Sequence, residues 1–179
     1  MNPDPTARFN TLVAPHLADA LAFARWITRD RADAEDVVQE ACVRAFRSID
    51  RFSGSNAKAW LLTIVRNTAF TWLSDKRRLS LVSLDDLSDQ ERLEVEQGEA
   101  CERDISPEAT IIALGDAALL EKLVSELPIG FREVLVLRDI QGLEYREISG
   151  VTGLPLGTVM SRLARARQKL ITQIRQERS

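Results

Sequence analysis

The 179-residue sequence has little of the chemistry that enzymes and metal sites need. It contains one histidine, His16, and two cysteines, Cys42 and Cys101, which stand far apart. Metal and redox motifs place Cys and His at short, fixed spacings, so no metal site and no cofactor are predicted. Unpaired cysteines favour a reducing compartment, so we expect the protein in the cytoplasm. No nucleophile–base pair or phosphate-binding loop is evident, which makes an enzyme the least favoured class.

Long apolar runs are missing as well. No stretch approaches the roughly 18 consecutive apolar residues that indicate a membrane span. The first residues, MNPDPTARF, have no basic segment leading into an apolar one, so no signal peptide is expected. Strand-like alternation is also absent, whereas apolar residues recur at spacings of three and four. The sequence therefore predicts an all-α fold of two small helical domains.

The charge is unevenly placed along the chain, although the net value is only −3. Residues 1–78 hold 12 Lys/Arg against 9 Asp/Glu, and residues 114–179 hold 10 against 8. Residues 79–113 hold 2 against 10 and contain no aromatic residue. This composition indicates a flexible acidic linker between two mildly basic parts. We therefore expect domains at 6–78 and 114–175, joined by a linker at 79–113.

Residues 31–49 form the clearest amphipathic pattern in the first half. An apolar ladder with a spacing of four begins at Val37, and Asp36, Gln39 and Glu40 lie together on the polar side. The polar side has two interpretations, a solvated face or a docking surface for a partner.

The next segment combines a loop with a long helix. Gly54 and its flanking serines indicate a loop over 50–56, and Asn56 is a good N-cap for a helix over 57–78. That helix ends in basic residues, Lys76 to Arg78. Basic residues suit the C-terminal end of a helix dipole, and together with aromatics they also suit single-stranded nucleic acid. Both interpretations stay open on the residues alone.

The C-terminal part predicts a helix-turn-helix over 144–170. A short helix pattern is followed by a break at Gly153 and Pro155 and then by a longer helix pattern. In the second helix the apolar positions recur on one face: Val159, Leu163, Ala166 and Leu170. A second stripe, basic and on the side expected to be exposed, contains Thr158, Arg162, Arg165 and Lys169. Two helices around a tight turn, with a basic second helix, are typical of DNA binding, although a merely solvated basic helix is the alternative.

Taken in order, three segments resemble an extracytoplasmic-function (ECF) sigma factor, a small bacterial transcription initiation subunit of the sigma-70 family. DAEDVVQEACVRAF (33–46) is similar to the family's polymerase-docking segment. AWLLTIVRNTAFTWL (59–73) is similar to its −10 element segment, and 127–170 resembles its −35-reading domain. The resemblance implies binding to the clamp helices of core RNA polymerase, to promoter DNA and to an anti-sigma factor, which is membrane-bound in some cases.

The resemblance also implies roles for particular residues. The polymerase-binding set is Asp36, Val37, Gln39, Glu40 and Arg44. The −10 element set is Ser53, Ser55, Asn56, Trp60, Arg66, Asn67, Lys76, Arg77 and Arg78. The −35 element set is Thr158, Ser161, Arg162, Arg165 and Lys169, of which the two arginines can pair with guanine edges.

Three rival functions compete with that of a sigma factor. An ordinary helix-turn-helix repressor or activator would usually dimerise on a palindrome, yet no heptad seam or dimer helix is apparent. An interaction protein would carry the helix-turn-helix without using it on DNA. A small all-α enzyme is disfavoured by the shortage of catalytic side chains.

Overall fold

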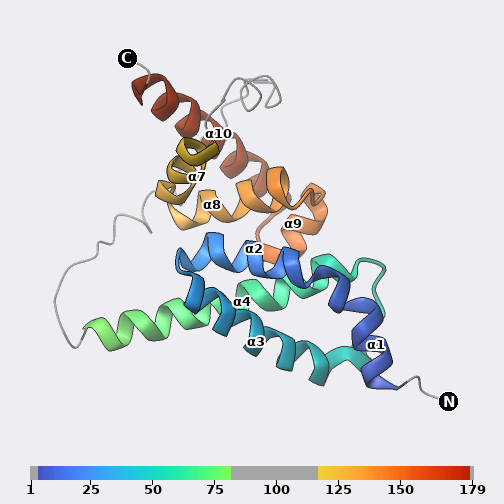
Figure 1. The fold of residues 1–179 in the computed structure, drawn as a ribbon. Helices are drawn as coiled ribbons and strands as arrows, with labels where there is room; N and C mark the ends of the chain where they lie inside the picture. The colour runs from blue at the N-terminus through green and yellow to red at the C-terminus, as the bar shows by residue number, and fades with distance from the viewer. Residues whose placement is uncertain (1–3, 82–116, 178–179) are drawn as a thin grey trace.

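The computed structural model describes residues 4–81 and 117–177, and every regular element in these two ranges is helical (Figure 1). The all-α prediction is therefore confirmed. The first range forms α1 (Pro5–Leu12), η1 (Ala14–His16), α2 (Leu17–Thr28), α3 (Arg31–Ser48), η2 (Ile49–Arg51) and α4 (Ala57–Leu81). The second forms α7 (Ala117–Glu126), α8 (Ile129–Leu135), η3 (Val136–Ile140), α9 (Tyr145–Thr152) and α10 (Leu156–Glu177). The predicted linker lies outside the described residues from position 82 to its end, as does Cys101.

The N-terminal half, α1 to α4, is a bundle in which α2, α3 and α4 pack on one another. The predicted apolar ladder of α3 is buried, and Val37 has no exposed surface. Both long helices have side-chain caps. Asp30 accepts the amide N–H of Asp33 at 2.9 Å, and Asn56 accepts that of Ala59 at 3.0 Å. The sequence-based N-cap at Asn56 is therefore confirmed.

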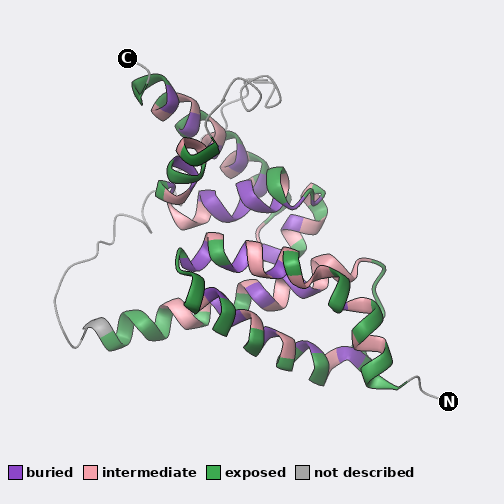
Figure 2. Cartoon of the chain, in the orientation of Figure 1, coloured by how far each residue is buried: buried purple, intermediate pink, exposed green. Residues whose placement is uncertain are grey.

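The C-terminal half, α7 to α10, is arranged around the long helix α10. Helices α7, α8 and α9 all pack on α10, and Figure 2 shows its buried residues on the side that faces them. The buried positions of α10 are Val159, Leu163, Ala166, Leu170 and Ile174. Helix α9 begins with a reciprocal capping box between Glu144 and Glu147 and ends at Gly153, which has a φ of 74°.

The helix that begins at Ile129 does not continue as a regular α-helix to its end. After α8 the backbone forms a π-helical turn, in which the N–H of Gln141 bonds to the carbonyl of Val136 at 2.8 Å. Such turns insert one extra residue and rotate the residues after it about the helix axis. Here the turn places Gln141, only 6% exposed, where its Nε2 donates to the Asp19 carbonyl at 3.3 Å.

The two halves contact each other. Helix α9 packs against α4 and α8 packs against α2, so α2 lies beside the C-terminal half in Figure 1. The sequence predicted two bundles but not this packing, because no periodicity within one helix identifies a partner helix that is distant in sequence.

Candidate nucleic-acid and polymerase interfaces

Helices α9 and α10 form the predicted helix-turn-helix. The turn between them is fixed by Gly153 in the left-handed region and by Ser149, whose hydroxyl donates to the Leu154 carbonyl at 2.6 Å. Helix α10 is the longer and comes after the turn, so it occupies the place of a recognition helix.

The predicted basic stripe of α10 is less exposed than the sequence suggested. Thr158, Arg162 and Arg165 are all partly buried, and Lys169 is exposed. The expectation of a fully exposed basic face is therefore corrected. The physical reason is that one flank of α10 faces α8, whose acidic residue Glu133 attracts the nearest arginine side chain.

Glu133 is the centre of a charge cluster where the two halves meet. Its carboxylate, 2% exposed, accepts hydrogen bonds from Arg66 Nε at 2.7 Å and from Arg66 Nη2 at 3.3 Å. Arg162 Nη1 lies 4.0 Å away, with its side chain 13% exposed. Burial lowers the pKa of Arg162, an effect that Glu133 opposes and Arg66 reinforces. A predicted −10 residue and a predicted −35 residue therefore share one carboxylate.

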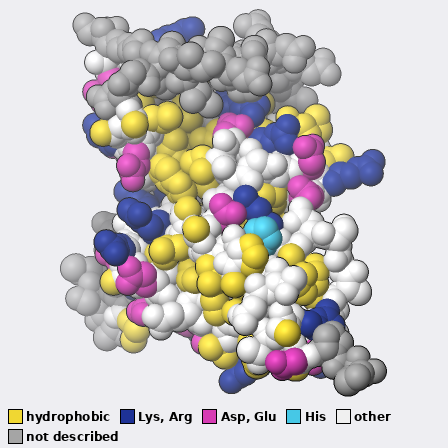
Figure 3. Space-filling model, turned by 45° about the vertical axis from the view of Figure 1, so that its right-hand side comes forward, with side chains coloured by type: hydrophobic (Ala, Val, Ile, Leu, Met, Phe, Trp, Pro, Cys, Tyr) yellow, Lys and Arg dark blue, Asp and Glu magenta, His cyan; other side chains and the backbone are white. Residues whose placement is uncertain are grey.

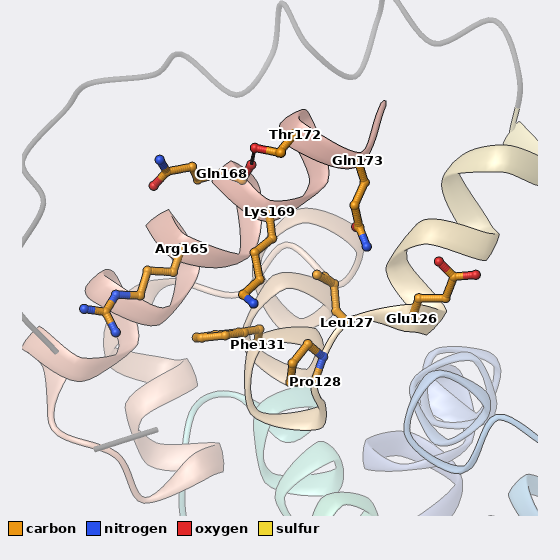
Figure 4. A pocket seen from close by; sticks show the side chains of 9 residues that line it. All are labelled: Glu126, Leu127, Pro128, Phe131, Arg165, Gln168, Lys169, Thr172 and Gln173. Carbon is orange, nitrogen blue, oxygen red and sulfur yellow. Dashed lines mark hydrogen bonds between the residues drawn. The ribbon is translucent and has the colours of Figure 1, made fainter. Parts of the chain in front are cut away.

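Farther along α10, the helix borders a shallow depression of about 650 Å³ (Figure 4). Lys169 extends from α10 toward the ring of Phe131, with its Nζ 5.7 Å from the ring centroid. Arg165, Gln168 and Thr172 line the same depression from α10. Ser161, the remaining member of the −35 set, is partly buried and donates to the Thr158 carbonyl at 3.1 Å.

The predicted −10 face begins at the N-terminal end of α4, and part of it is also engaged with the C-terminal half. Asn56 uses its oxygen as the cap of α4 and its Nδ2 to donate to Glu147 of α9. Lys58 donates to the Gln141 carbonyl at 2.9 Å and lies 3.2 Å from Asp19.

Trp60, also in the −10 set, has a partner that the sequence analysis missed. Its ring lies 4.8 Å from that of Phe52, at an interplanar angle of 35°. The Phe52 carbonyl accepts a hydrogen bond from Arg8 at 2.9 Å, and a Cβ on Gly54 would lie 3.0 Å from the Phe52 ring. The sequence did offer one signal for this pair: Phe52 is an aromatic residue in the loop just before the helix that carries Trp60.

The other predicted −10 residues lie on exposed parts of the loop and of α4. Ser53, Ser55, Asn67, Arg77 and Arg78 are all exposed. Lys76 is exposed as well but pairs with Asp33 of α3, and this hydrogen bond raises the pKa of the lysine. The structure therefore brings Asn56 and Arg66 to the junction between the halves, packs Trp60 against Phe52 of the loop, and leaves the remaining residues exposed.

The predicted polymerase-binding set lies on α3, with one exception. Asp36, Gln39, Glu40 and Arg44 are on its outer side, and Arg44 bonds Glu40 at 2.8 Å. Val37 is the exception, because its side chain is buried in the core together with Ala41 and Ala45 on the inner side of α3. Val43, which is 44% exposed, lies one turn beyond Gln39 and was missed, because a hydrophobic residue is read as core by default.

Comparisons with known proteins match both halves. Sigma-70 region 2 matches residues 12–79, and Sigma-70, region 4 matches residues 117–170. The chain is 34% identical over 143 residues to the ECF RNA polymerase sigma-E factor of Escherichia coli strain K12, covering 79% of this chain and 74% of the relative.

The chain belongs to the ECF RNA polymerase sigma factors.

Two further relatives of this sigma factor are also named as RNA polymerase sigma factors. The RNA polymerase sigma-H factor of Pseudomonas aeruginosa is 34% identical over 164 residues, with 90% of this chain and 83% of the relative covered. The ECF RNA polymerase sigma factor SigE of Mycolicibacterium smegmatis is 32% identical over 162 residues. In that comparison 90% of this chain is covered, but the chain spans only 60% of the relative's length.

Two solved structures share the fold. The sigma factor RpoE from Bartonella quintana, in complex with the anti-sigma factor NepR, has a TM-score of 0.72 and 27% identity, covering 93% of this chain and 96% of that one. CnrH in complex with the cytosolic domain of CnrY has a TM-score of 0.60 at the same identity, covering 93% and 86%.

The surface of this sigma factor is not uniformly basic. On the face in Figure 3, basic and acidic side chains are interspersed, with exposed hydrophobic atoms between them. In residues 4–81 and 117–177, no His, Cys, Asp or Glu cluster could hold a metal ion, and no helix has the length and hydropathy to cross a bilayer.

Proposed function

We propose that this sigma factor binds core RNA polymerase, recognises the −10 and −35 promoter elements and directs transcription initiation without covalent chemistry of its own. The helix-turn-helix of α9 and α10 supports this proposal most directly. It follows an N-terminal half that matches region 2, so both promoter-reading parts are present in one chain. In this proposal residues 6–78 bind polymerase and the −10 element, 79–113 are the linker, and 114–175 read the −35 element.

The proposed polymerase contact is the exposed face of α3. Asp36, Gln39 and Glu40 lie close together there, and the exposed side chain of Val43 adds an apolar surface beside them. A charged rim around an apolar centre is the usual composition of a protein interface. The proposed −10 contact is the loop before α4 and the exposed side of that helix, where basic groups can bind phosphate.

Promoter geometry requires the two halves to separate. Elements centred near −35 and −10 are about 25 base pairs apart, or about 85 Å of duplex at about 3.4 Å per base pair. The 22 residues of α10 span only about 33 Å. In the described arrangement Arg66 of the −10 set touches Glu133 of the −35 half at 2.7 Å. The arrangement is therefore a closed form, and promoter recognition needs an open one.

An anti-sigma factor that holds the closed form is the proposed regulator, and we place the complex in the cytoplasm. RpoE was solved in complex with the anti-sigma factor NepR, and CnrH in complex with the cytosolic domain of CnrY. A partner that binds the closed form better than the open one would keep this sigma factor inactive by mass action.

The test is transcription by core polymerase plus this protein on genomic DNA, followed by sequencing of the transcript starts. We expect starts that share one pair of upstream elements, and a failure to start at any promoter would refute the proposal. An ordinary DNA-binding regulator would instead bind its sites without core polymerase and leave the starts unchanged.

The docking assignment has a separate test. Asp36→Lys with Glu40→Lys should weaken core polymerase binding at least tenfold in a titration of the full chain, since charge reversal at an interface adds repulsion. The matched control is Glu35→Lys with Arg31→Glu, which swaps an exposed ion pair near the start of α3. If the control weakens binding equally, the contact is not specific to this face.

A further inference from the structure

Helix α10 has an exposed apolar strip that packing does not explain. Leu156 is 41% exposed and Met160 is 50% exposed, and Ala164 continues the strip one turn later, also exposed. The three residues are spaced by four, so they share one side of the helix. Neither Leu156 nor Met160 belongs to the packed hydrophobic cluster among the residues that the structure describes.

The strip lies in the first turns of α10, the part of a recognition helix that approaches base edges. The neighbouring core residues, Val159 and Leu163, are buried, and each follows a residue of the strip by three positions, so the strip runs along the edge of the buried face. A large unbranched side chain such as Met160 exposes apolar surface to water here at a free-energy cost, and this cost would be recovered by contact with an apolar group of a ligand.

Two arginines that could have made this region strongly basic are held within the protein. Arg162 points toward Glu133 at 4.0 Å. Arg167 bonds Asp139 through two nitrogens, at 2.6 and 3.2 Å, with its side chain 21% exposed. Burial acts to lower the pKa of Arg167, but the hydrogen bond to Asp139 outweighs this effect, so the net change raises the pKa. The side chains of Arg162 and Arg167 are therefore already paired within the protein, and the apolar strip at the start of α10 is a separate feature.

The apolar group that duplex DNA presents in its major groove is the C5-methyl of thymine. We propose that Met160, flanked by Leu156, is a specificity residue that contacts a thymine methyl group in the −35 element. This inference rests on the proposed function, because it requires α10 to enter the groove. It adds an apolar contact to the hydrogen bonds that basic and hydroxyl side chains would make.

The test replaces each −35 thymine in turn by deoxyuridine, which removes only the methyl group and keeps the base pair. Complexes of promoter DNA with core polymerase and the full chain are measured by competition at fixed salt. At one position we expect wild-type binding to fall about fourfold, the effect of burying one methyl group. Met160→Ala should bind the thymine promoter about fourfold more weakly and show no further loss with deoxyuridine.

The matched control is Ile140→Ala, which removes a similarly exposed side chain, 49% exposed, outside α10. This variant should keep the full sensitivity to deoxyuridine. The proposal is overturned if wild type is insensitive at every thymine, or if Met160→Ala stays as sensitive as wild type. It is equally overturned if Met160→Ala weakens association with core polymerase itself, since the strip would then contact protein. Absence of any specific complex with the unmodified promoter would instead refute the proposed function.

Discussion

Replacing Glu133 by glutamine tests whether the charge cluster joins the two halves. The carboxylate is 2% exposed, accepts two hydrogen bonds from Arg66 and lies 4.0 Å from Arg162. Glutamine keeps the size but removes the charge, which leaves two guanidinium groups facing each other with little access to water. Breaking a buried ion pair on one side costs about 3–5 kcal/mol. We expect Glu133→Gln to lower the free energy of unfolding by about 3 kcal/mol, because the amide oxygen still accepts one bond.

Urea unfolding followed by far-UV circular dichroism measures this loss. Two double-mutant cycles then separate the partners of Glu133. The cycle with Arg66→Met reports on the contact between the halves, and the cycle with Arg162→Met reports on the C-terminal half alone. Direct contacts of this kind give coupling energies of about 0.5–3 kcal/mol, and we expect both cycles to fall in that range.

Glu40→Gln is the matched control, because Glu40 pairs with Arg44 at 2.8 Å on the exposed surface of α3. Exposed pairs at this helical spacing contribute only about 0.3–0.5 kcal/mol. A loss at Glu133 no larger than the loss at Glu40 would refute the reasoning about burial. A coupling with Arg162 but none with Arg66 would show that the halves are separate in solution, which contradicts the closed arrangement.

Three further predictions concern single residues. Arg29→Gly should raise the free energy of unfolding by about 1 kcal/mol in urea titrations, because Arg29 ends α2 at a φ of 61° where a side chain is strained; a loss would contradict this. Glu147→Ala should lower it by about 1–2 kcal/mol, since both the capping box and the bond from Asn56 are lost, and an unchanged melting temperature would count against both contacts. Arg78→Ala should reduce the salt dependence of promoter binding by the polymerase complex by about one unit of slope, and an unchanged slope would exclude a phosphate contact.

Much of the fold is predictable from periodicity and caps in the sequence. The ladder beginning at Val37 defined the inner face of α3, and Asn56 marked the start of α4 because its side chain can satisfy a free amide. The break at Gly153 defined the helix-turn-helix. These signals are local, so each is readable within about one or two helical turns.

The features that the sequence did not predict depend on contacts between distant segments. The π-helical turn before Gln141 places that residue against α2, more than a hundred positions earlier in the chain. Arg162 was assigned to an exposed stripe by its angle on a helical wheel, which cannot show that Glu133 lies opposite it on α8. Val43 and Phe52 were passed over because hydrophobic residues are assigned to cores unless a structure shows them exposed or in a loop.

The composition of the junction suits the proposed separation of the two halves. Hydrogen bonds across it are made by Arg66, Lys58 and Asn56 from the N-terminal half and by Gln141 from the C-terminal half, and the polar ends of the first three can find water or DNA phosphate once the halves separate. A well-packed hydrophobic junction of similar volume would be as stable or more so, because buried ion pairs lose much of their Coulomb energy to desolvation. Opening it would expose apolar surface with nothing to replace the lost contacts. With charged groups, each bond lost on opening can be replaced by one to a phosphate, so the free-energy difference between closed and DNA-bound forms stays small. Binding to polymerase and promoter then needs only a few kcal/mol of differential affinity to shift the population toward the open form.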